Sequence, residues 1–314
     1  DPAEGLSVGT LSPTALIGAG TGTLLAFTIA GFMGIESSAM YSEEAINPSK
    51  TIPNATLISI LIISVFYGFS SWAIAQSTGE AFVVESAQKS GSDLFFNFIG
   101  EQGYEAIVPL IQLLLVTSLF AAVTAFHNSI SRYLMALGRE EVIWKKLGAV
   151  SQSGAPVSAS LLQSAFGFVV IAAALASQYL TGYDETFPST IVFSWMSNAG
   201  GFGLVFLLLA TSISVFSYFK KHTGIYPVFV TKLAPIVAII GFGTMFVLIL
   251  SNFENLIGDA DLWYLVFIIP GIILLCGVAG FLRGEQLKRS QPDIYANVGS
   301  GHPPVRSTLN DSKT

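Results

Sequence analysis

The chain has 314 residues, of which 52% are hydrophobic and 11% are charged. A soluble domain carries about 25% charged residues, so this composition excludes an ordinary soluble globular protein and predicts a multi-pass membrane protein. The net charge of −6 gives no reason to expect a nucleic-acid partner. The single cysteine, Cys276, excludes an intramolecular disulfide and a cysteine-based zinc site, and we expect neither a metal nor a cofactor.

Seven stretches are long and apolar enough to cross the lipid bilayer. We expect helices, because open strands cannot satisfy their backbone hydrogen bonds in lipid. The predicted fold class is therefore an all-α integral membrane protein. The predicted spans are Thr14–Tyr41, Ile52–Gln76, Ile107–Asn128, Val157–Tyr179, Thr190–Tyr218, Leu233–Leu250 and Leu262–Leu282.

The basic residues divide unequally between the two sides of these spans. Of the 14 lysines and arginines, all except Lys89 lie in the connections of one side or in the C-terminal tail. Loops rich in lysine and arginine stay in the cytoplasm, which predicts an external N-terminus and a cytoplasmic C-terminus. From about Gly284 the tail is polar and contains Pro303 and Pro304, which predicts disorder.

The first predicted span contains the sequence GFMGIE, residues 31–36. Two glycines flank Phe32 and Met33, and Glu36 follows where a lipid-facing helix favours leucine. A helix broken over Gly31–Ile35 frees backbone carbonyls, which are tolerated at membrane depth only where they line a cavity. Such carbonyls suit an ammonium group, and the amides that open the next half-helix suit an anion. Glu36 is then a gating or proton-linked carboxylate; alternatively, it lies near the cytoplasmic end and reaches water.

A second polar segment, SWMSNAGGFG, lies in the fifth span at residues 194–203. Ser197 and Asn198 are followed by three glycines, which predicts a loosened helical segment that lines a binding site. The alternative is that these glycines only let a neighbouring helix approach closely.

Two motifs make the chain similar to a known family. FMGIE followed by EEAINPSKTIPNA occupies the first span and its loop, and SRYLMALGRE followed by Pro156 comes after the third span. In this order they resemble the amino acid–polyamine–organocation transporters, over essentially the whole chain up to Leu282. The resemblance implies transport of amino acids or related amines across the cell membrane, by exchange or by symport with a proton.

The resemblance also implies an architecture. In that family twelve spans form two inverted five-helix repeats plus two further helices, and the first and sixth helices are broken. Because the motif of the sixth helix lies in the first span here, the chain resembles the second half of such a transporter. Residues 1–219 would be the second repeat, residues 220–283 two additional spans, and residues 284–314 the cytoplasmic tail. The first five helices would be missing from a piece or supplied by a separate N-terminal half-transporter, and the chain alone is expected to be inactive.

Two groups of site residues follow from the resemblance. The substrate-binding residues would be Gly31, Phe32, Met33, Gly34, Ile35, Ser197 and Asn198. The gating residues would be Glu36 and Phe126, the latter close to the family's aromatic gate on the eighth helix.

Other classes compete with a transporter. A retinal protein needs a lysine midway along its last span, and Leu262–Leu282 has none. A seven-helix receptor is disfavoured because the chain lacks DRY-like and NPxxY-like sequences and a cysteine pair. A non-transporting membrane subunit would not need a broken helix with Glu36. An enzyme is disfavoured because no catalytic set of side chains is visible.

Overall fold

The computed structural model describes residues 7–9, 12, 14, 17, 18, 20–42, 45–79, 82–184, 186–224, 226–257 and 262–304. These residues form helices and turns without a strand, which confirms the all-α fold class. Among them, seven helical segments are long and apolar enough to cross a membrane, as the sequence predicts. They are Thr21–Tyr41, Pro48–Thr78, Leu94–Arg139, Val157–Leu180, Pro188–Lys221, Phe229–Ser251 and Leu265–Ser290.

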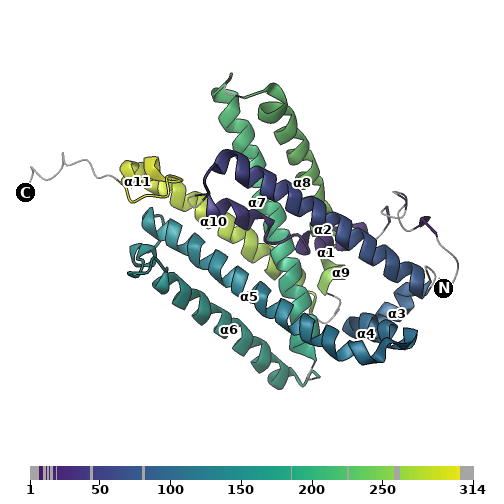
Figure 1. Ribbon diagram of the computed structural model, residues 1–314. Helices are drawn as coiled ribbons and strands as arrows, with labels where there is room; N and C mark the ends of the chain where they lie inside the picture. The colour runs from purple at the N-terminus through teal and green to yellow at the C-terminus, as the bar shows by residue number, and fades with distance from the viewer. Residues whose placement is uncertain are drawn as a thin grey trace, which may run out of the picture. The chain divides into compact units, whose positions relative to one another are not determined.

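Figure 1 shows the course of the individual helices. The α-helices are α1 (Thr21–Ala30), α2 (Pro48–Thr78), α3 (Val83–Ser90), α4 (Leu94–Ile99), α5 (Val108–Arg139), α6 (Val157–Thr181), α7 (Phe193–Lys221), α8 (Ala234–Ser251), α9 (Phe253–Ile257), α10 (Leu265–Ser290) and α11 (Pro292–Asn297). Two tighter segments matter below, the 3-10 helices η3 (Ile35–Tyr41) and η7 (Lys145–Gly148).

Proline and glycine explain several helix ends. Helix α2 begins at Pro48, whose missing N–H costs nothing in the first turn. Helix α6 begins directly after Pro156 and ends before Gly182, which has a left-handed φ of 72° and donates its N–H to the carbonyl of Gln178.

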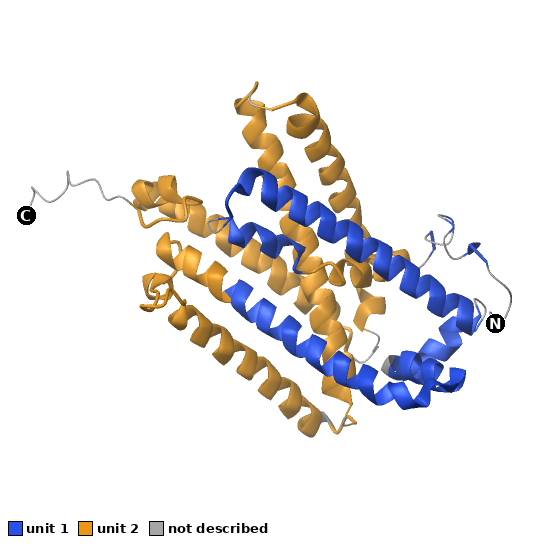
Figure 2. Cartoon of the chain, viewed as in Figure 1, with its two compact units in different colours: residues 1–18, 34–130 blue, residues 19–33, 131–314 orange. Residues whose placement is uncertain are grey.

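The chain divides into two compact units (Figure 2). Unit 1 comprises residues 1–18 and 34–130, and unit 2 comprises residues 19–33 and 131–314. The chain therefore passes from unit 2 to unit 1 between Met33 and Gly34, inside the first span. The division of the chain at residue 219 that the resemblance implies stays a prediction.

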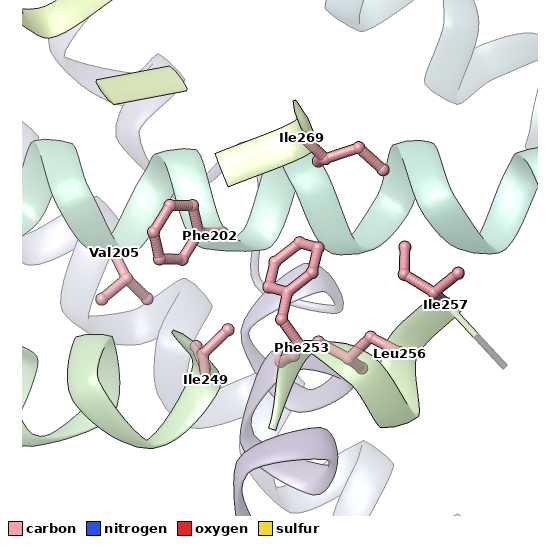
Figure 3. Packing of buried hydrophobic residues seen from close by; sticks show 8 residues of the cluster. Phe202, Val205, Ile249, Phe253, Leu256, Ile257 and Ile269 are labelled. Atoms are coloured by element: carbon pink, nitrogen blue, oxygen red, sulfur yellow. The ribbon is translucent and has the colours of Figure 1, made fainter. Parts of the chain in front are cut away.

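The hydrophobic core of unit 2 surrounds α7, which contacts α1, α8, α9 and α10 (Figure 3). Phe202 is fully buried and stacks on Phe246 with ring centroids 4.9 Å apart, while Phe253 meets its edge at 5.8 Å. Trp195 donates its indole N–H to the carbonyl of Ile257 at 3.0 Å. These aromatic contacts fix the face of α7 that carries the predicted polar segment.

The structure continues helically beyond the predicted end of the last span. Helix α10 extends to Ser290 and α11 follows, where the sequence predicts a disordered tail from Gly284. The physical reason is burial, because Leu287 and Ile294 are only 1% and 8% exposed. Residues 305–314 of the predicted tail lie outside the described residues.

Candidate functional site

The first span is interrupted at its middle, as GFMGIE predicts. Helix α1 ends at Ala30, and the following amides turn tightly: Phe32 N–H donates to Ile29 and Met33 N–H to Ala30. Gly34 then adopts a left-handed φ of 104°, after which η3 begins. Only glycine reaches this conformation without strain, so Gly34 is the residue that reverses the backbone.

Side chains from η3 hold the interruption in place. Glu36, which is half-buried, accepts the Gly34 N–H on its Oε2 at 2.9 Å. Ser37 donates its hydroxyl to the Gly34 carbonyl at 2.5 Å and its N–H to the same oxygen at 3.0 Å. Both polar groups of the Gly34 backbone are thereby satisfied without a continuous helix.

Other backbone groups of the interruption stay available. Among the described residues, no backbone N–H donates to the carbonyl oxygens of Gly31 or Met33. Both oxygens carry partial negative charge at the C-terminal end of a half-helix, where a cation is stabilised. An ammonium group has three donors and no acceptor, so it matches this arrangement chemically.

Within unit 1, the predicted aromatic gate lies beside the interruption. The ring of Phe126 is so placed that a methyl group on Gly34 would lie 3.7 Å from its Cε1. Two residues further along α5, the side-chain amide of Asn128 donates to the hydroxyl of Tyr41 at 3.1 Å. The structure thus brings Phe126 beside Gly34 and adds Asn128 and Tyr41 as a contact between α5 and η3, while the gating role of Phe126 stays a prediction.

Within unit 2, the polar segment of α7 lies against α1. A methyl group on Gly201 would lie 3.0 Å from the carbonyl oxygen of Ala26, and one on Gly200 would lie 2.8 Å from Met33 Sδ. Helix α7 is continuous over Phe193–Lys221, so the prediction of a loosened segment is wrong. The glycines serve close packing instead, which is the alternative that the sequence left open.

Asn198 is the most buried polar side chain of this segment, at 1% exposure. Its amide nitrogen donates to the hydroxyl of Ser194 at 3.4 Å, and its Oδ1 has no hydrogen-bond partner among the described residues. A buried amide oxygen without a donor is costly, by about 1–3 kcal/mol. Ser197, the preceding residue, is half-buried.

The predicted site residues therefore fall into two groups. Gly31, Phe32, Met33, Ser197 and Asn198 belong to unit 2, and Gly34, Ile35, Glu36 and Phe126 belong to unit 1. Sequence reasoning missed Ser37 and Tyr41, whose hydrogen bonds depend on the 3-10 geometry of η3. The described residues contain no cluster of three or more metal-ligating side chains.

Seven membrane-spanning helical segments and an interrupted first span define a multi-pass membrane protein of the transporter type. A family model described as "Amino acid permease" matches residues 13–292, and the chain belongs to this family. The match covers parts of both units and every predicted site residue.

Two curated relatives match the chain in part. It is 26% identical to the aromatic amino acid permease FywP of Lactococcus lactis subsp. cremoris, over 73% of this chain and 48% of the relative. It is 25% identical to the amino-acid permease GAP5 of Candida albicans, over 58% of this chain and 28% of the relative. The chain thus spans less than half the length of these relatives. No solved structure matches it.

Proposed function

We propose that the chain forms the second half of the substrate pathway of a secondary amino acid transporter. The observation that supports this most directly is the interrupted span, with the carbonyl oxygens of Gly31 and Met33 free of backbone donors, in a member of the amino acid permease family. These oxygens accept the ammonium group of the substrate. The substrate carboxylate is bound by the other half of the pathway, on a separate N-terminal chain or preceding helices.

Asn198 completes the substrate-binding side in unit 2. Its buried Oδ1 lacks a donor, and a substrate N–H would supply one. Ser197 adds a hydroxyl on the next position of the helix. Because α7 packs closely on α1 at Gly201, the positions of Ser197 and Asn198 are fixed relative to Gly31 within unit 2.

Glu36 and Phe126 form the gate in unit 1. In the resting arrangement the Glu36 carboxylate accepts the Gly34 amide, so movement or protonation of Glu36 releases that amide. Such a change alters the backbone at the interruption, which couples a proton to opening of the pathway. In this proposal the N-terminus lies outside the cell and the C-terminus in the cytoplasm, which the unequal distribution of lysine and arginine supports.

Uptake of labelled amino acids tests the proposal. The chain is expressed with five preceding helices from a full-length parent, and phenylalanine and tyrosine are tried first, because one relative is named for aromatic amino acids. Saturable uptake is expected.

Asn198→Ala should raise the KM for the substrate about tenfold, the equivalent of one lost hydrogen bond. Ser212→Ala is the control on the same helix, since that hydroxyl bonds only its own helix at Leu208. If no combination of this chain with five preceding helices takes up amino acids, the proposed transport function is rejected.

A further inference from the structure

The turn that ends α5 carries a carboxylate where helices favour glycine. Val142 N–H donates to Leu137 and Glu141 N–H to Gly138, which is the hydrogen-bond pattern of a Schellman motif. Glu141 occupies its left-handed position with φ of 58°, the one positive φ of a non-glycine residue among the described residues. Its Oε1 lies 2.8 Å from Lys145 Nζ. Backbone strain of this kind concentrates at functional sites.

Beside this turn lies an open surface cavity of about 560 Å³, whose lining residues all belong to unit 2. Its lining combines charged, aromatic and aliphatic side chains: Glu141, Val142, Ile143, Trp144, Lys145, Arg283, Gln291 and Ile294. Arg283 directly follows Phe281 and Leu282, the last two residues of the predicted span Leu262–Leu282. The cavity therefore lies where the span ends, at the depth of the polar headgroups of a bilayer.

Hydrogen-bond donors without a protein acceptor face this cavity. Arg283 donates its Nε–H to the Val142 carbonyl at 2.9 Å and an Nη1–H to Gln286 at 3.0 Å. These bonds fix the guanidinium, while its Nη2 has no acceptor within the described ranges. The indole of Trp144 is 64% exposed, its N–H also lacks an acceptor there, and Lys146 Nζ lies 5.4 Å from the ring centre. A tryptophan with neighbouring cations is typical of the membrane interface.

A second set of hydrogen bonds, next to the residues that line the cavity, joins the end of α5 to the segment after α11, and we name it the tail latch. The Glu140 carboxylate, 6% exposed, accepts the N–H of Gly299 at 3.0 Å and that of Gly301 at 2.8 Å. Arg139 returns a bond to the Gly301 carbonyl at 3.1 Å. The tail latch ties the segment that follows α11 to the end of α5, and Ile294 of α11 lines the cavity.

We propose that this cavity binds the phosphate-bearing headgroup of an anionic lipid. The two basic side chains of the lining, Lys145 and Arg283, outnumber its one carboxylate, Glu141, and Lys146 lies beside the lining residue Trp144, so the cavity favours an anion. Its aliphatic lining, Val142, Ile143 and Ile294, accommodates the glycerol and first methylenes, which a free phosphate ion lacks. In the orientation proposed above, the lipid belongs to the cytoplasmic leaflet, where anionic lipids attract juxtamembrane basic residues.

Native mass spectrometry of the purified full chain tests the proposal. The chain is mixed with equal amounts of phosphatidylglycerol and phosphatidylcholine of identical acyl chains, and the retained lipid is counted. Phosphatidylglycerol is expected to dominate. Arg283→Gln should lower its retention about fivefold, as expected for one basic residue near a membrane surface. Arg289→Gln is the matched control, because that arginine lies on the same helix, is 84% exposed and pairs with Glu285.

Two further measurements keep the result decisive. Lys145→Gln leaves every bond of Arg283 and of the tail latch in place and should also lower retention, even where Arg283→Gln disturbs folding. Excess sn-glycerol phosphate should not displace the lipid. Equal retention of both lipids, equal losses in Arg283→Gln and Arg289→Gln, or displacement by glycerol phosphate would each overturn the proposal, the last by showing a soluble phosphate as the occupant.

Discussion

Two segments of the chain combine glycines with polar side chains inside a span, yet only one interrupts its helix. At GFMGIE the backbone reverses at Gly34, whereas SWMSNAGGFG remains within the continuous helix α7. At the first segment, Glu36 recaptures the amide that the interruption frees. At the second, Gly201 instead brings α7 close to α1. Glycine permits an interruption, but a nearby side chain that satisfies the freed backbone group makes it stable.

The largest effect is expected for a close-packing glycine. Gly201→Val should lower the free energy of unfolding by about 3 kcal/mol, because its Cβ would meet the Ala26 carbonyl oxygen at 3.0 Å and backbone cannot move aside easily. Thermal unfolding in detergent, followed by tryptophan fluorescence, measures the loss. Gly203→Ala is the control, since the nearest atoms to its Cβ belong to Ile273 at 4.0 Å. Similar losses in both variants would contradict a packing role for Gly201.

A different mechanism predicts a smaller loss at the interruption. Gly34→Ala meets no clash, because Phe126 lies at an ordinary 3.7 Å, but its φ of 104° is strained for alanine. The expected cost is about 2 kcal/mol. Gly34→Asn should be milder, since asparagine tolerates left-handed backbone better. The same unfolding assay, together with uptake in the full-length parent, checks this order. A more stable alanine variant would mean that Gly34 is not conformationally required.

Removal of the Glu36 carboxylate sharpens the comparison further. Glu36→Ala should destabilise by about 1 kcal/mol, because the Gly34 N–H loses its acceptor. Glu36→Gln keeps an oxygen that can accept the Gly34 N–H, so it should retain most of the stability. Its amide cannot take up and release a proton as a carboxylate does. Uptake measured across pH separates the two roles: a pH profile of Glu36→Gln identical to that of the parent would reject proton coupling at this residue.

The smallest effect is expected for a similar bond in an exposed loop before α7. The pKa of the Asp184 carboxyl lies below its usual value, mainly because the backbone N–H of Thr186 donates to it and also because the Thr186 hydroxyl does. A lowered pKa in the folded state stabilises the protein above the unfolded value, about pH 4, and this stability is lost as pH falls through the folded value. The unfolding temperature of Asp184→Asn should therefore approach that of the parent in acid. A difference that is independent of pH would contradict the bond.

The sequence was sufficient to predict the seven spans, because apolar length alone determines what crosses lipid. It was insufficient at the ends of the spans. Helix α10 continues to Ser290 because Leu287 is buried, and hydropathy does not report tertiary burial. The same limit explains why α11 was not predicted.

For the candidate site, the sequence predicted where the backbone breaks but not how it is held. Gly34 and Glu36 were recognisable from residue type, whereas the contact of Phe126 with Gly34 joins residues far apart in the sequence and was not predicted. The bond from Glu36 back to an amide two residues earlier depends on a left-handed backbone that sequence does not specify. The continuity of α7 depends on its neighbour α1, which no local pattern describes.

The tail latch couples the position of the C-terminal segment to that of a membrane helix. Because Glu140 directly follows α5 and holds Gly299 and Gly301, a displacement of that helix end is transmitted to the tail. A fluorophore attached at Ser300 would therefore act as an indicator of helix movement without any label inside the bilayer. For the same reason, a large domain fused to the C-terminus could strain the hydrogen bonds of the tail latch and displace the end of α5.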